Sequence, residues 1–551
     1  MSTSLRLNSN EGPLSPVALL ATLATLDPEL LRRYPDVSTL EAALAARVGV
    51  SPDRVIVTAG ADEAIDRVCR AYLGPGRTLL RSEPTFEMFD HFARLSRAAE
   101  IASVPWRCGE FPLAAFLDRL DIHPAVIAVV SPNNPTGAMA SARDVRRLAA
   151  AAPASMVLLD NVYGEYADEE LTTRLLDLPN VVVLRTLSKA WGLAGCRIGY
   201  AIGSAEVIAA LRAAGAPYSV AAPSVALALR QLAEGEAMLQ SHVARVRDER
   251  ATLSATLKKL GLEPLPSQAN FILVECGVLA PFLTAALASL GIIVRDFPNH
   301  PGLTSALRIT LPGDADAFGR LVAAFETVLA PEALLFDLDG VIADVQQSQR
   351  AAIAATARSF GVPATAEEVA TAIRSGDASN DWRVTQRVIE AGGVAASLED
   401  VTVQYQSLYL GDNGTAGLRE HERLIPRVSL LERLAASRPL GLVTGRPRAE
   451  AEWFLNRVGV ASLFSELITM EDAAVKPDPA AVRLALTRLG VRRAWMIGDT
   501  PDDVRSALQA GVLPLGVVAP GDDPSLASAA LREAGAARVL DRLSDLLELL
   551  P

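Results

Sequence analysis

Short apolar runs rich in β-branched residues alternate with longer alanine- and leucine-rich stretches of helical period along most of this chain. Such alternation is typical of α/β folds, in which helices cover a largely parallel sheet. The first part is predicted to form strands at residues 54–58, 78–81, 126–130, 156–160, 181–185 and 197–202, and the second at 334–336, 440–443, 495–497 and 513–518. Glycine, proline or polar residues follow these strands, where the binding loops of such sheets lie.

The chain is long enough for more than one domain. Its 551 residues exceed the roughly 250 to 300 at which a single core stops growing. A predicted helix over 315–329 ends at Ala330-Pro331 and a strand begins at once, so we place the boundary there. The first domain, 1–330, should combine a large α/β part with a smaller α+β lobe. The second, 331–551, carries a helical insert at about 345–420 that is predicted to cap its site.

Composition restricts the partners and the compartment. Half of the residues are hydrophobic and 21% are charged, which indicates a globular chain. The net charge of −12 without a basic stripe argues against binding to nucleic acid or to an anionic membrane surface. Four scattered cysteines without a CxxC pair indicate reduced thiols. No apolar run approaches the roughly 18 residues of a spanning helix and no leader opens the chain, so we expect a cytoplasmic location.

Several strand ends of the first domain carry residues suited to a phosphorylated aldehyde cofactor. Lys189 follows the strand at 181–185 and can bind an aldehyde covalently, although a surface lysine is the alternative. Residues 60–63 open a helix whose N–H groups can hold a phosphate. Asn134 lies in a rigid turn, and Asp160 ends a strand three residues before Tyr163. A buried aspartate there would keep a pyridine nitrogen protonated.

With these segments in place, residues 5–312 resemble fold-type I pyridoxal-phosphate aminotransferases, most closely the histidinol-phosphate aminotransferases. The matching stretches are residues 7–11, 33–36, 60–63, 84–86, 131–137, 187–189, 195–197, 216–218 and 306–309. The resemblance implies pyridoxal 5'-phosphate as cofactor. Lys189 would then bind the cofactor aldehyde and move the proton between the substrate and the cofactor. One departure stands out, because Asn161-Val162 occupies the place of the usual Glu-Ala.

The same resemblance implies roles for further residues. The implied cofactor contacts are Asp160 at the pyridine nitrogen, Asn134 and Tyr163 at the phenolic oxygen, Phe86 on the ring, and Ala61, Asp62, Ser188 and Arg197 at the phosphate. The implied substrate contacts are Arg308, Arg295 and Tyr218. Arg295 as a surface cation and Phe86 as a core residue are the structural alternatives. In the family, the tyrosine that matches Tyr34 comes from the neighbouring subunit, which implies a homodimer.

The second domain opens with a different signature. Asp337 and Asp339 follow an apolar strand, which suits a carboxylate nucleophile, an acid/base and a Mg²⁺ ligand, although an acidic loop is the alternative. Downstream come Thr444-Gly445-Arg446, Lys476-Pro477 and residues 498–503. In this order they resemble the haloacid dehalogenase superfamily, and the resemblance covers about 333–551. It implies a Rossmann-like α/β domain with a cap.

This second resemblance implies an aspartyl-phosphate mechanism. Asp337 would attack phosphorus, and Asp339 would protonate the leaving alcohol and then activate water. Thr444 and Lys476 would bind the phosphoryl oxygens. The implied Mg²⁺ ligands are Asp337, the carbonyl group of Asp339 and Asp499, with Asp503 orienting Lys476 or the metal shell. In the cap, the polar segment 376–382 either contacts the leaving group or forms a loop between two cap helices.

Two active sites in one chain suggest consecutive reactions. The favoured hypothesis is aminotransfer from glutamate to imidazole acetol phosphate, which gives histidinol phosphate, followed by removal of the phosphate. One alternative keeps both enzymes but moves them to a specialised pathway with another phosphorylated or nucleotide-derived substrate, including decarboxylation or carbon bond formation. A further alternative makes the second domain a regulatory module without catalysis. In each case the partners are small phosphorylated molecules.

Overall fold

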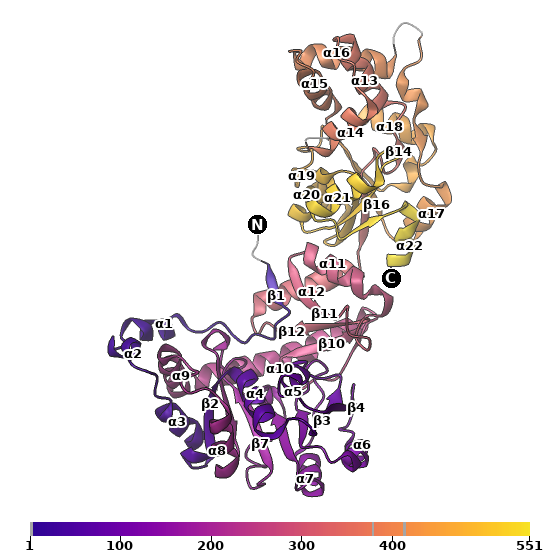
Figure 1. Ribbon diagram of the computed structural model, residues 1–551. Coiled ribbons are helices and arrows are strands. Elements are labelled where there is room, and N and C mark those ends of the chain that lie inside the picture. Colours follow the sequence, from indigo (N-terminus) through magenta and orange to yellow (C-terminus); the bar gives the residue numbers. More distant parts are fainter. Residues whose placement is uncertain (1–3, 377–379, 412–414, 551) are drawn as a thin grey trace. The chain divides into compact units, whose positions relative to one another are not determined.

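The computed structural model describes residues 4–376, 380–411 and 415–550 (Figure 1). By its internal contacts the chain divides into two compact units. The N-terminal unit comprises Leu5–Ala280 with Val294–Arg320, and the described part of the C-terminal unit comprises Ser4, 281–293 and 321–550. Each unit contains its own sheet and is described separately below.

The N-terminal unit is built on a seven-stranded sheet with the order β2-β8-β7-β6-β5-β3-β4. Its strands are β2 (Val55–Ala59), β3 (Thr78–Glu83), β4 (Glu100–Pro105), β5 (Val126–Val130), β6 (Met156–Asp160), β7 (Val181–Thr186) and β8 (Ile198–Ile202). Strand β8 runs antiparallel to both of its neighbours, and the other pairs are parallel. The carboxyl ends of β2, β5, β6 and β7 therefore meet the amino end of β8 at one edge.

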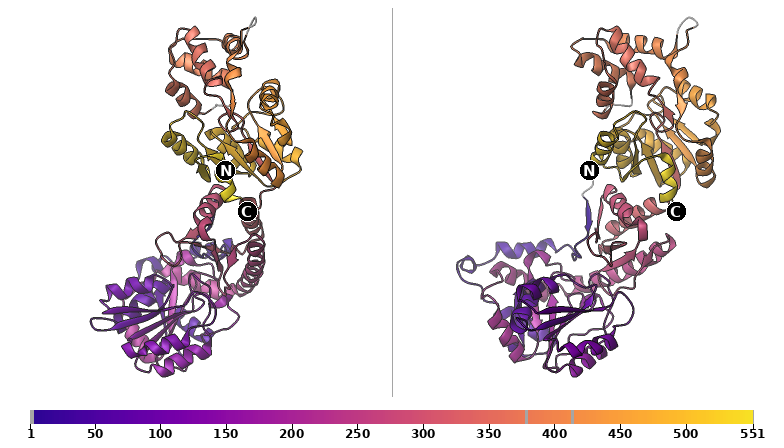
Figure 2. Two further views of the ribbon diagram at one scale, coloured as in Figure 1. Left: turned by 90° about the vertical axis from the view of Figure 1, so that its right-hand side faces the viewer. Right: turned by 45° about the vertical axis from the view of Figure 1, so that its right-hand side comes forward.

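Helices cover both faces of this sheet, as the two views in Figure 2 show. Packing on both faces explains why the sequence of strand β5 is a continuous apolar run. Val126, Ala128 and Val130 pack into one core with helices α4 (Gly60–Tyr72), α5 (Met88–Leu95) and α8 (Ala205–Ala214). Ile127 and Val129 pack on the opposite face with α6 (Leu113–Asp118) and α7 (Ala142–Ala151). Side chains alternate along a strand, so a doubly covered strand must be apolar throughout.

A smaller sheet has the order β1-β11-β12-β10-β9. Its strands are β1 (Leu5–Leu7), β9 (Glu263–Pro264), β10 (Phe271–Glu275), β11 (Ile292–Asp296) and β12 (Ala306–Thr310). Strand β12 pairs antiparallel with β10 and with β11. The remaining helices of this part are α1 (Val17–Ala24), α2 (Glu29–Arg32), α3 (Ser38–Val48), α9 (Ala222–Glu234) and α10 (Glu236–Lys259).

The C-terminal unit contains a six-stranded parallel sheet with the order β17-β16-β13-β18-β19-β20. Its strands are β13 (Ala333–Phe336), β16 (Leu440–Val443), β17 (Glu466–Ile468), β18 (Ala494–Gly498), β19 (Leu513–Val517) and β20 (Arg538–Leu540). Helices α17 (Val428–Ser437), α18 (Arg448–Arg457), α19 (Ala480–Leu489), α20 (Pro501–Ala510), α21 (Pro524–Ala534) and α22 (Leu546–Leu549) complete this layer structure.

Two helices from earlier in the chain also join the C-terminal unit by their contacts, α11 (Ala280–Ser289) and the end of α12 (Ala315–Leu329). The fully buried Trp495 links both to the sheet. Its indole Nε1–H donates to the carbonyl oxygen of Thr327 at 2.9 Å, and its ring lies 5.9 Å from that of Phe282. These contacts bury the indole and satisfy its only donor.

The insert after β13 is helical, as the sequence predicts. It contains α13 (Gln349–Ser359), α14 (Ala366–Arg374), α15 (Asp381–Ala391) and α16 (Leu398–Leu410), and these four helices lie together in Figure 1. Their amphipathic faces form a separate core that includes Ile353, Val384, Val401 and Tyr405. Antiparallel strands β14 (Ala343–Asp344) and β15 (Arg423–Leu424) connect the insert to the sheet domain. We call these four helices the cap.

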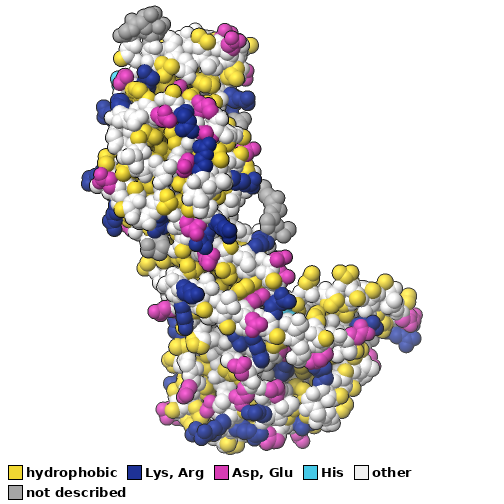
Figure 3. Space-filling model, turned by 180° about the vertical axis from the view of Figure 1, so that it is seen from behind, with side chains coloured by type: hydrophobic (Ala, Val, Ile, Leu, Met, Phe, Trp, Pro, Cys, Tyr) yellow, Lys and Arg dark blue, Asp and Glu magenta, His cyan; other side chains and the backbone are white. Residues whose placement is uncertain are grey.

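The surface carries charges of both signs. On the face drawn in Figure 3, Lys and Arg side chains are interspersed with Asp and Glu side chains. Among the described residues, no helix combines the length and the apolar character that crossing a membrane requires.

Candidate active sites

The carboxyl edge of the seven-stranded sheet holds a cavity of about 710 Å³. Of the residues that the sequence predicts for this site, eleven line it: Ala61, Asp62, Phe86, Asn134, Asp160, Tyr163, Ser188, Lys189, Arg197, Arg295 and Arg308. Tyr34 and Tyr218 do not. Their rings stack on each other at 4.6 Å, and the two residues are 79% and 60% exposed.

Lys189 lies between the end of β7 and the cavity. Its Nζ donates to the carbonyl oxygen of Ser9 at 3.3 Å and lies 5.7 Å from the centre of the Tyr163 ring. Burial and the charge of Arg308 lower the pKa of Lys189 to about 8. About a tenth of the amine is therefore neutral at pH 7, and the neutral amine is the form that can attack an aldehyde.

Asp160, the last residue of β6, is buried at the base of the cavity. Burial raises the pKa of its carboxyl group to about 7, although one oxygen accepts from the Val162 N–H at 3.2 Å. Desolvation has this effect because, in the described part of the chain, no cation pairs with the carboxylate and the charge of Lys189 only partly offsets burial. A positively charged ring nitrogen at this point would supply the missing partner.

This buried carboxylate gives a stability prediction for the apoprotein. Its raised pKa means that ionisation costs stability as the pH increases from about 4 to about 7. Asp160→Asn should therefore raise the free energy of unfolding at pH 8, by about 4 kcal/mol at most. At about pH 5 the gain should shrink to less than half. Urea unfolding of the two apoproteins at both pH values measures this, and an equal gain at both would contradict it.

A cradle for a phosphate group lies at the amino end of α4. Gly60 has a φ of +81°, and a Cβ atom there would lie 2.3 Å from the guanidinium of Arg197. Arg197 pairs with Asp62 at 3.0 Å. The buried hydroxyl of Ser188 has no hydrogen-bond partner in the described part of the chain. Free N–H groups, a cation and an unused hydroxyl at a helix start suit a phosphate.

Two arginines extend the cavity toward the small sheet. Arg308 is buried and donates to Asn134 Oδ1 at 2.6 Å and to the Asn8 carbonyl at 2.8 Å. Arg295 is its cross-strand partner in the β11–β12 register and is exposed. Adjacent guanidinium groups are suited to an anionic substrate group. The sequence alone is also compatible with a surface cation at Arg295, and the structure places this residue on the cavity wall.

Asn10 was assigned no role from the sequence, although it lies within a matched stretch. It is 1% exposed, has a φ of +53°, and its Nδ2 donates to the Tyr163 hydroxyl at 2.9 Å. Its Oδ1 accepts from Thr310 at 3.1 Å. The unusual backbone conformation of a non-glycine residue is the kind of local feature that only coordinates reveal.

The two residues that depart from the pattern of the resembled family, Asn161 and Val162, have different surroundings. Asn161 is fully buried and connects loops, since its Nδ2 donates to the Ser131 carbonyl at 2.6 Å and its Oδ1 accepts from Thr172 at 3.2 Å. Val162 lines the cavity. The exchange of Glu-Ala for Asn-Val therefore changes the cavity wall through Val162, whereas Asn161 supports the loop.

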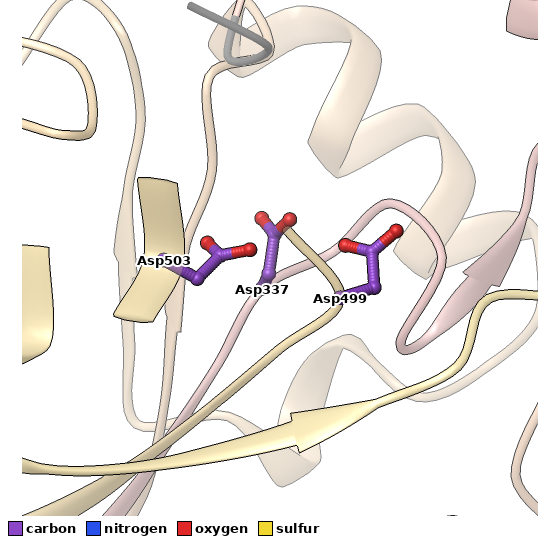
Figure 4. Close-up of side chains that lie close together, drawn as sticks. All are labelled: Asp337, Asp499 and Asp503. Carbon is purple, nitrogen blue, oxygen red and sulfur yellow. The ribbon is translucent and has the colours of Figure 1, made fainter. Parts of the chain in front are cut away.

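In the C-terminal unit, β13, β16 and β18 are parallel neighbours, so the residues after them share one edge. Figure 4 shows Asp337, Asp499 and Asp503 facing one another there. One carboxylate oxygen from each lies within 4.8 Å of the others. Lys476 Nζ pairs with Asp337 at 2.7 Å and with Asp503. Although burial opposes its charge, Asp337 and Asp503 raise the pKa of this lysine.

The acid cluster fits a hard divalent cation at Asp337 and Asp499. Burial raises the pKa of both carboxyl groups. Oδ1 of Asp499 is buried without a hydrogen-bond partner among the residues described. Asp503, in contrast, accepts from the N–H and the hydroxyl of Thr500 at 3.0 and 2.7 Å and also binds Lys476. Two oxygen ligands with an unused lone pair suit Mg²⁺, and Asp503 suits the positioning of Lys476.

The carboxylate of Asp339 points to a different partner. It accepts from Arg446 Nε at 2.8 Å, and Arg446 also pairs with the buried Glu422 at 3.0 Å. Tyr409 of the cap donates to Glu422 at 2.8 Å. Arg446 belongs to the motif Thr444-Gly445-Arg446, but the sequence alone indicates no role for it. Thr444 is buried behind it, and its hydroxyl accepts from the Arg446 N–H at 3.1 Å.

The cap reaches this site through the polar segment singled out in the sequence. Asn380, Asp381 and Trp382 line the cavity above Asp337 and Asp339, and residues 377–379 lie outside the described part. Asp381 accepts from the Tyr405 hydroxyl at 2.8 Å. Burial and the charge of Asp339 raise the pKa of Asp381 to about 7.

The two sheets and their sites define an aminotransferase-like fold joined to a phosphohydrolase-like fold, and comparison with known proteins agrees. The chain belongs to the class I and II aminotransferase family, whose model matches residues 2–325. Residues 331–511 match the model of the haloacid dehalogenase-like hydrolases.

Individual relatives include histidinol-phosphate aminotransferases. Histidinol-phosphate aminotransferase of Pectobacterium carotovorum subsp. carotovorum (strain PC1) is 35% identical over 333 residues, which cover 58% of this chain and 90% of that protein. Imidazoleglycerol-phosphate dehydratase of Phytophthora nicotianae is 40% identical over 237 residues, 40% of this chain and 52% of that protein. The crystal structure of histidinol-phosphate aminotransferase from Sinorhizobium meliloti in complex with pyridoxal 5'-phosphate has a TM-score of 0.54 and 26% identity, covering 59% of this chain and 90% of that one.

Proposed function

We propose that this chain is a bifunctional enzyme that forms a phosphorylated amine by pyridoxal-phosphate-dependent aminotransfer and hydrolyses a phosphate monoester with Mg²⁺. The observation that carries the proposal is that one chain holds two sites, each with a candidate nucleophile beside groups suited to binding phosphate. Lys189 lies in a cavity with the cradle at α4, and Asp337 lies beside Lys476.

At the first site, the residues present fit pyridoxal phosphate. When bound, it supplies an electron-accepting ring that allows an amino group to be exchanged for a carbonyl. Asp160 would hold the ring nitrogen, and Ser188 and Arg197 would hold the phosphate. The neutral amine of Lys189 would bind the aldehyde carbon and then carry the proton on its Nζ. The pair Arg308 and Arg295 would orient the anionic group of the substrate.

At the second site, Asp337 would attack phosphorus while the bond from phosphorus to the alcohol oxygen breaks. Asp339 would give its proton to that oxygen, and would later take a proton from the water that hydrolyses the aspartyl phosphate. Arg446 fixes the direction of the Asp339 carboxylate. Lys476 offsets the charge of the phosphoryl oxygens. Asp337 and Asp499 would hold Mg²⁺, which supplies further positive charge at the phosphoryl group.

For the substrates we propose imidazole acetol phosphate with glutamate as amino donor, giving histidinol phosphate, and then histidinol and phosphate. The support comes from the relatives, one named for histidinol phosphate and another for imidazoleglycerol phosphate. Both names describe phosphate monoesters. A single polypeptide would then carry two consecutive steps on one phosphorylated compound.

The substrate assignment has a direct test. The purified chain with histidinol phosphate should release phosphate only with Mg²⁺, and should transfer the amino group of histidinol phosphate to 2-oxoglutarate. Coupled assays of phosphate and glutamate measure the two reactions separately. Absence of both with this compound would reject the histidine assignment, and activity with a generic aryl phosphate would still support the phosphatase.

Val162 is the residue that favours a second candidate substrate. It replaces the usual alanine on the cavity wall and is larger, so the cavity can select another phosphorylated or nucleotide-derived compound. Such a substrate could also undergo decarboxylation or carbon bond formation. Incubating the chain with a panel of phosphorylated amines and identifying which are consumed would distinguish the two assignments.

We also propose a homodimer. The amino-terminal arm exposes apolar side chains, with Leu14 at 94%, Val17 at 80%, Leu31 at 75% and Tyr34 at 79%. Exposed apolar residues that gather in one segment indicate an interface. A second copy would cover them and could bring its Tyr34 to the cofactor site. Light scattering of the purified chain measures its mass.

A further inference from the structure

The cavity beneath the cap has an uneven charge balance. Its lining contains three cationic side chains, and each is already paired with carboxylates. Lys476 pairs with Asp337 and Asp503, Arg446 with Asp339 and Glu422, and Arg350 with Asp522. Two further lining carboxylates, Asp381 and Glu450, form no ion pair within the described residues, although the nearby charge of Arg446 acts to lower the pKa of both.

These two carboxylates are held by neutral donors from the cap. The Tyr405 hydroxyl donates to Asp381 at 2.8 Å, and the Gln406 amide donates to Glu450 at 3.1 Å. Tyr405 and Gln406 are consecutive on α16, so one turn of this helix directs both acids. Burial and the charge of Asp339 raise the pKa of Asp381, and burial raises that of Glu450. A cation beside such a partly buried carboxylate would lower its pKa and stabilise the charged form.

The surroundings of the two acids are aromatic and apolar. Trp382, next to Asp381, lines the same cavity, together with Ile353 and Ile373 from the cap helices. The phosphoryl-handling residues Asp337 and Lys476 form the floor of the cavity, and Asp339, which would protonate the leaving oxygen, belongs to the same lining. The leaving alcohol of a bound ester must therefore extend toward Asp381, Glu450 and Trp382.

We propose that this pocket selects phosphate monoesters whose alcohol part carries a protonated amine, bound by Asp381 and Glu450, next to an aromatic or apolar body that contacts Trp382. The proposal rests on the phosphatase activity proposed above and specifies its substrate class. A neutral or anionic alcohol would leave both partly buried carboxylates without a cation. Burying unpaired charge is costly, so the pocket discriminates against such esters.

The test uses a pair of esters that differ only in the amine. Phenylalaninol phosphate and its analogue with hydrogen in place of the amino group have the same aromatic body. With the full-length chain and Mg²⁺, kcat/KM should be at least about tenfold higher for the amino ester, because a hydrogen-bonded ion pair in such a site contributes that much. Asp381→Asn and Glu450→Gln should each lower this ratio toward one, mainly by raising KM for the amino ester.

The control is Glu399→Gln, which removes an exposed carboxylate from the same cap and should keep the preference of the parent chain. Calorimetric binding of both esters to the Asp337→Asn chain adds a readout that needs no hydrolysis. Equal binding of the two esters would overturn the cation pocket, even where both are hydrolysed. Equal losses for both esters in Asp381→Asn would also overturn it, because a structural role predicts that result. If the amino ester binds more tightly but the parent chain hydrolyses neither ester, the phosphatase activity is rejected and the cation pocket still stands.

Discussion

Replacing Asp337 by Asn is expected to lower phosphate release by at least about a thousandfold, because the amide cannot form the covalent phosphoryl link. Asp337 lies 2.7 Å from Lys476 and within a cluster of carboxylates that share one small volume. The substitution preserves shape and removes one buried charge, so the fold should persist. The measurement is Mg²⁺-dependent hydrolysis of an aryl phosphate and of histidinol phosphate by the full-length chain.

The matched control for this change is Asp541→Asn, an exposed carboxylate of the same unit that should leave hydrolysis within about twofold. Aminotransfer should also persist in Asp337→Asn, since Lys189 and its cavity lie in the other unit. Hydrolysis that survives in Asp337→Asn would show that another group attacks phosphorus. If the parent chain and both variants all fail to hydrolyse phosphate esters, the regulatory alternative is supported.

Lys189→Ala is expected to abolish aminotransfer, with a loss of at least about a thousandfold, because it removes both the amine that binds the aldehyde and the proton carrier. The lowered pKa of Lys189, about 8, is part of the reason, since it makes the neutral amine available. Amino transfer from histidinol phosphate to 2-oxoglutarate measures the loss. The visible absorbance of the protein-bound cofactor should also change, and dialysis should then remove the cofactor.

Lys258→Ala serves as the control, because this lysine lies exposed in the last turn of α10, away from the cavity. It should retain both the absorbance and the aminotransfer of the parent chain. Phosphate release should continue in Lys189→Ala, which separates the two chemistries within one polypeptide. Aminotransfer that survives without Lys189 would contradict the assigned nucleophile and proton carrier.

The central strands of both sheets could be predicted from the sequence because they are buried on two faces. The apolar runs at 126–130 and 156–160 coincide with β5 and β6. Strands β4, β17 and β20 were missed. Each ends its sheet in the strand order, β17 and β20 have three residues, and β4 alternates exposed and buried positions. A strand that is short or alternates in burial has a short or interrupted apolar pattern, whereas β2, which also ends its sheet, is buried along most of its length and could be predicted.

The residues that follow central strands could also be predicted as site residues. Asp160 is the last residue of a buried strand, and Asp337 directly follows another. Parallel strands bring such ends to one edge of a sheet. The pairings among these residues could not be predicted. Arg446 holds Asp339, and Asn10 holds Tyr163 across more than a hundred residues of sequence. No local pattern encodes a contact that depends on how distant loops pack.

What the sequence by itself determined is the chemistry available at each sheet edge, since residue type and strand order suffice for that. Lys189 and the pair Asp337 and Asp339 are examples. The tertiary structure alone decided which charges are paired. It showed Tyr34 exposed and outside the first cavity, and among the described residues it left Asp381 and Glu450 without an ion pair in the cavity beneath the cap. Pairing depends on distances of a few ångströms between residues from separate helices, and burial then amplifies each unpaired charge.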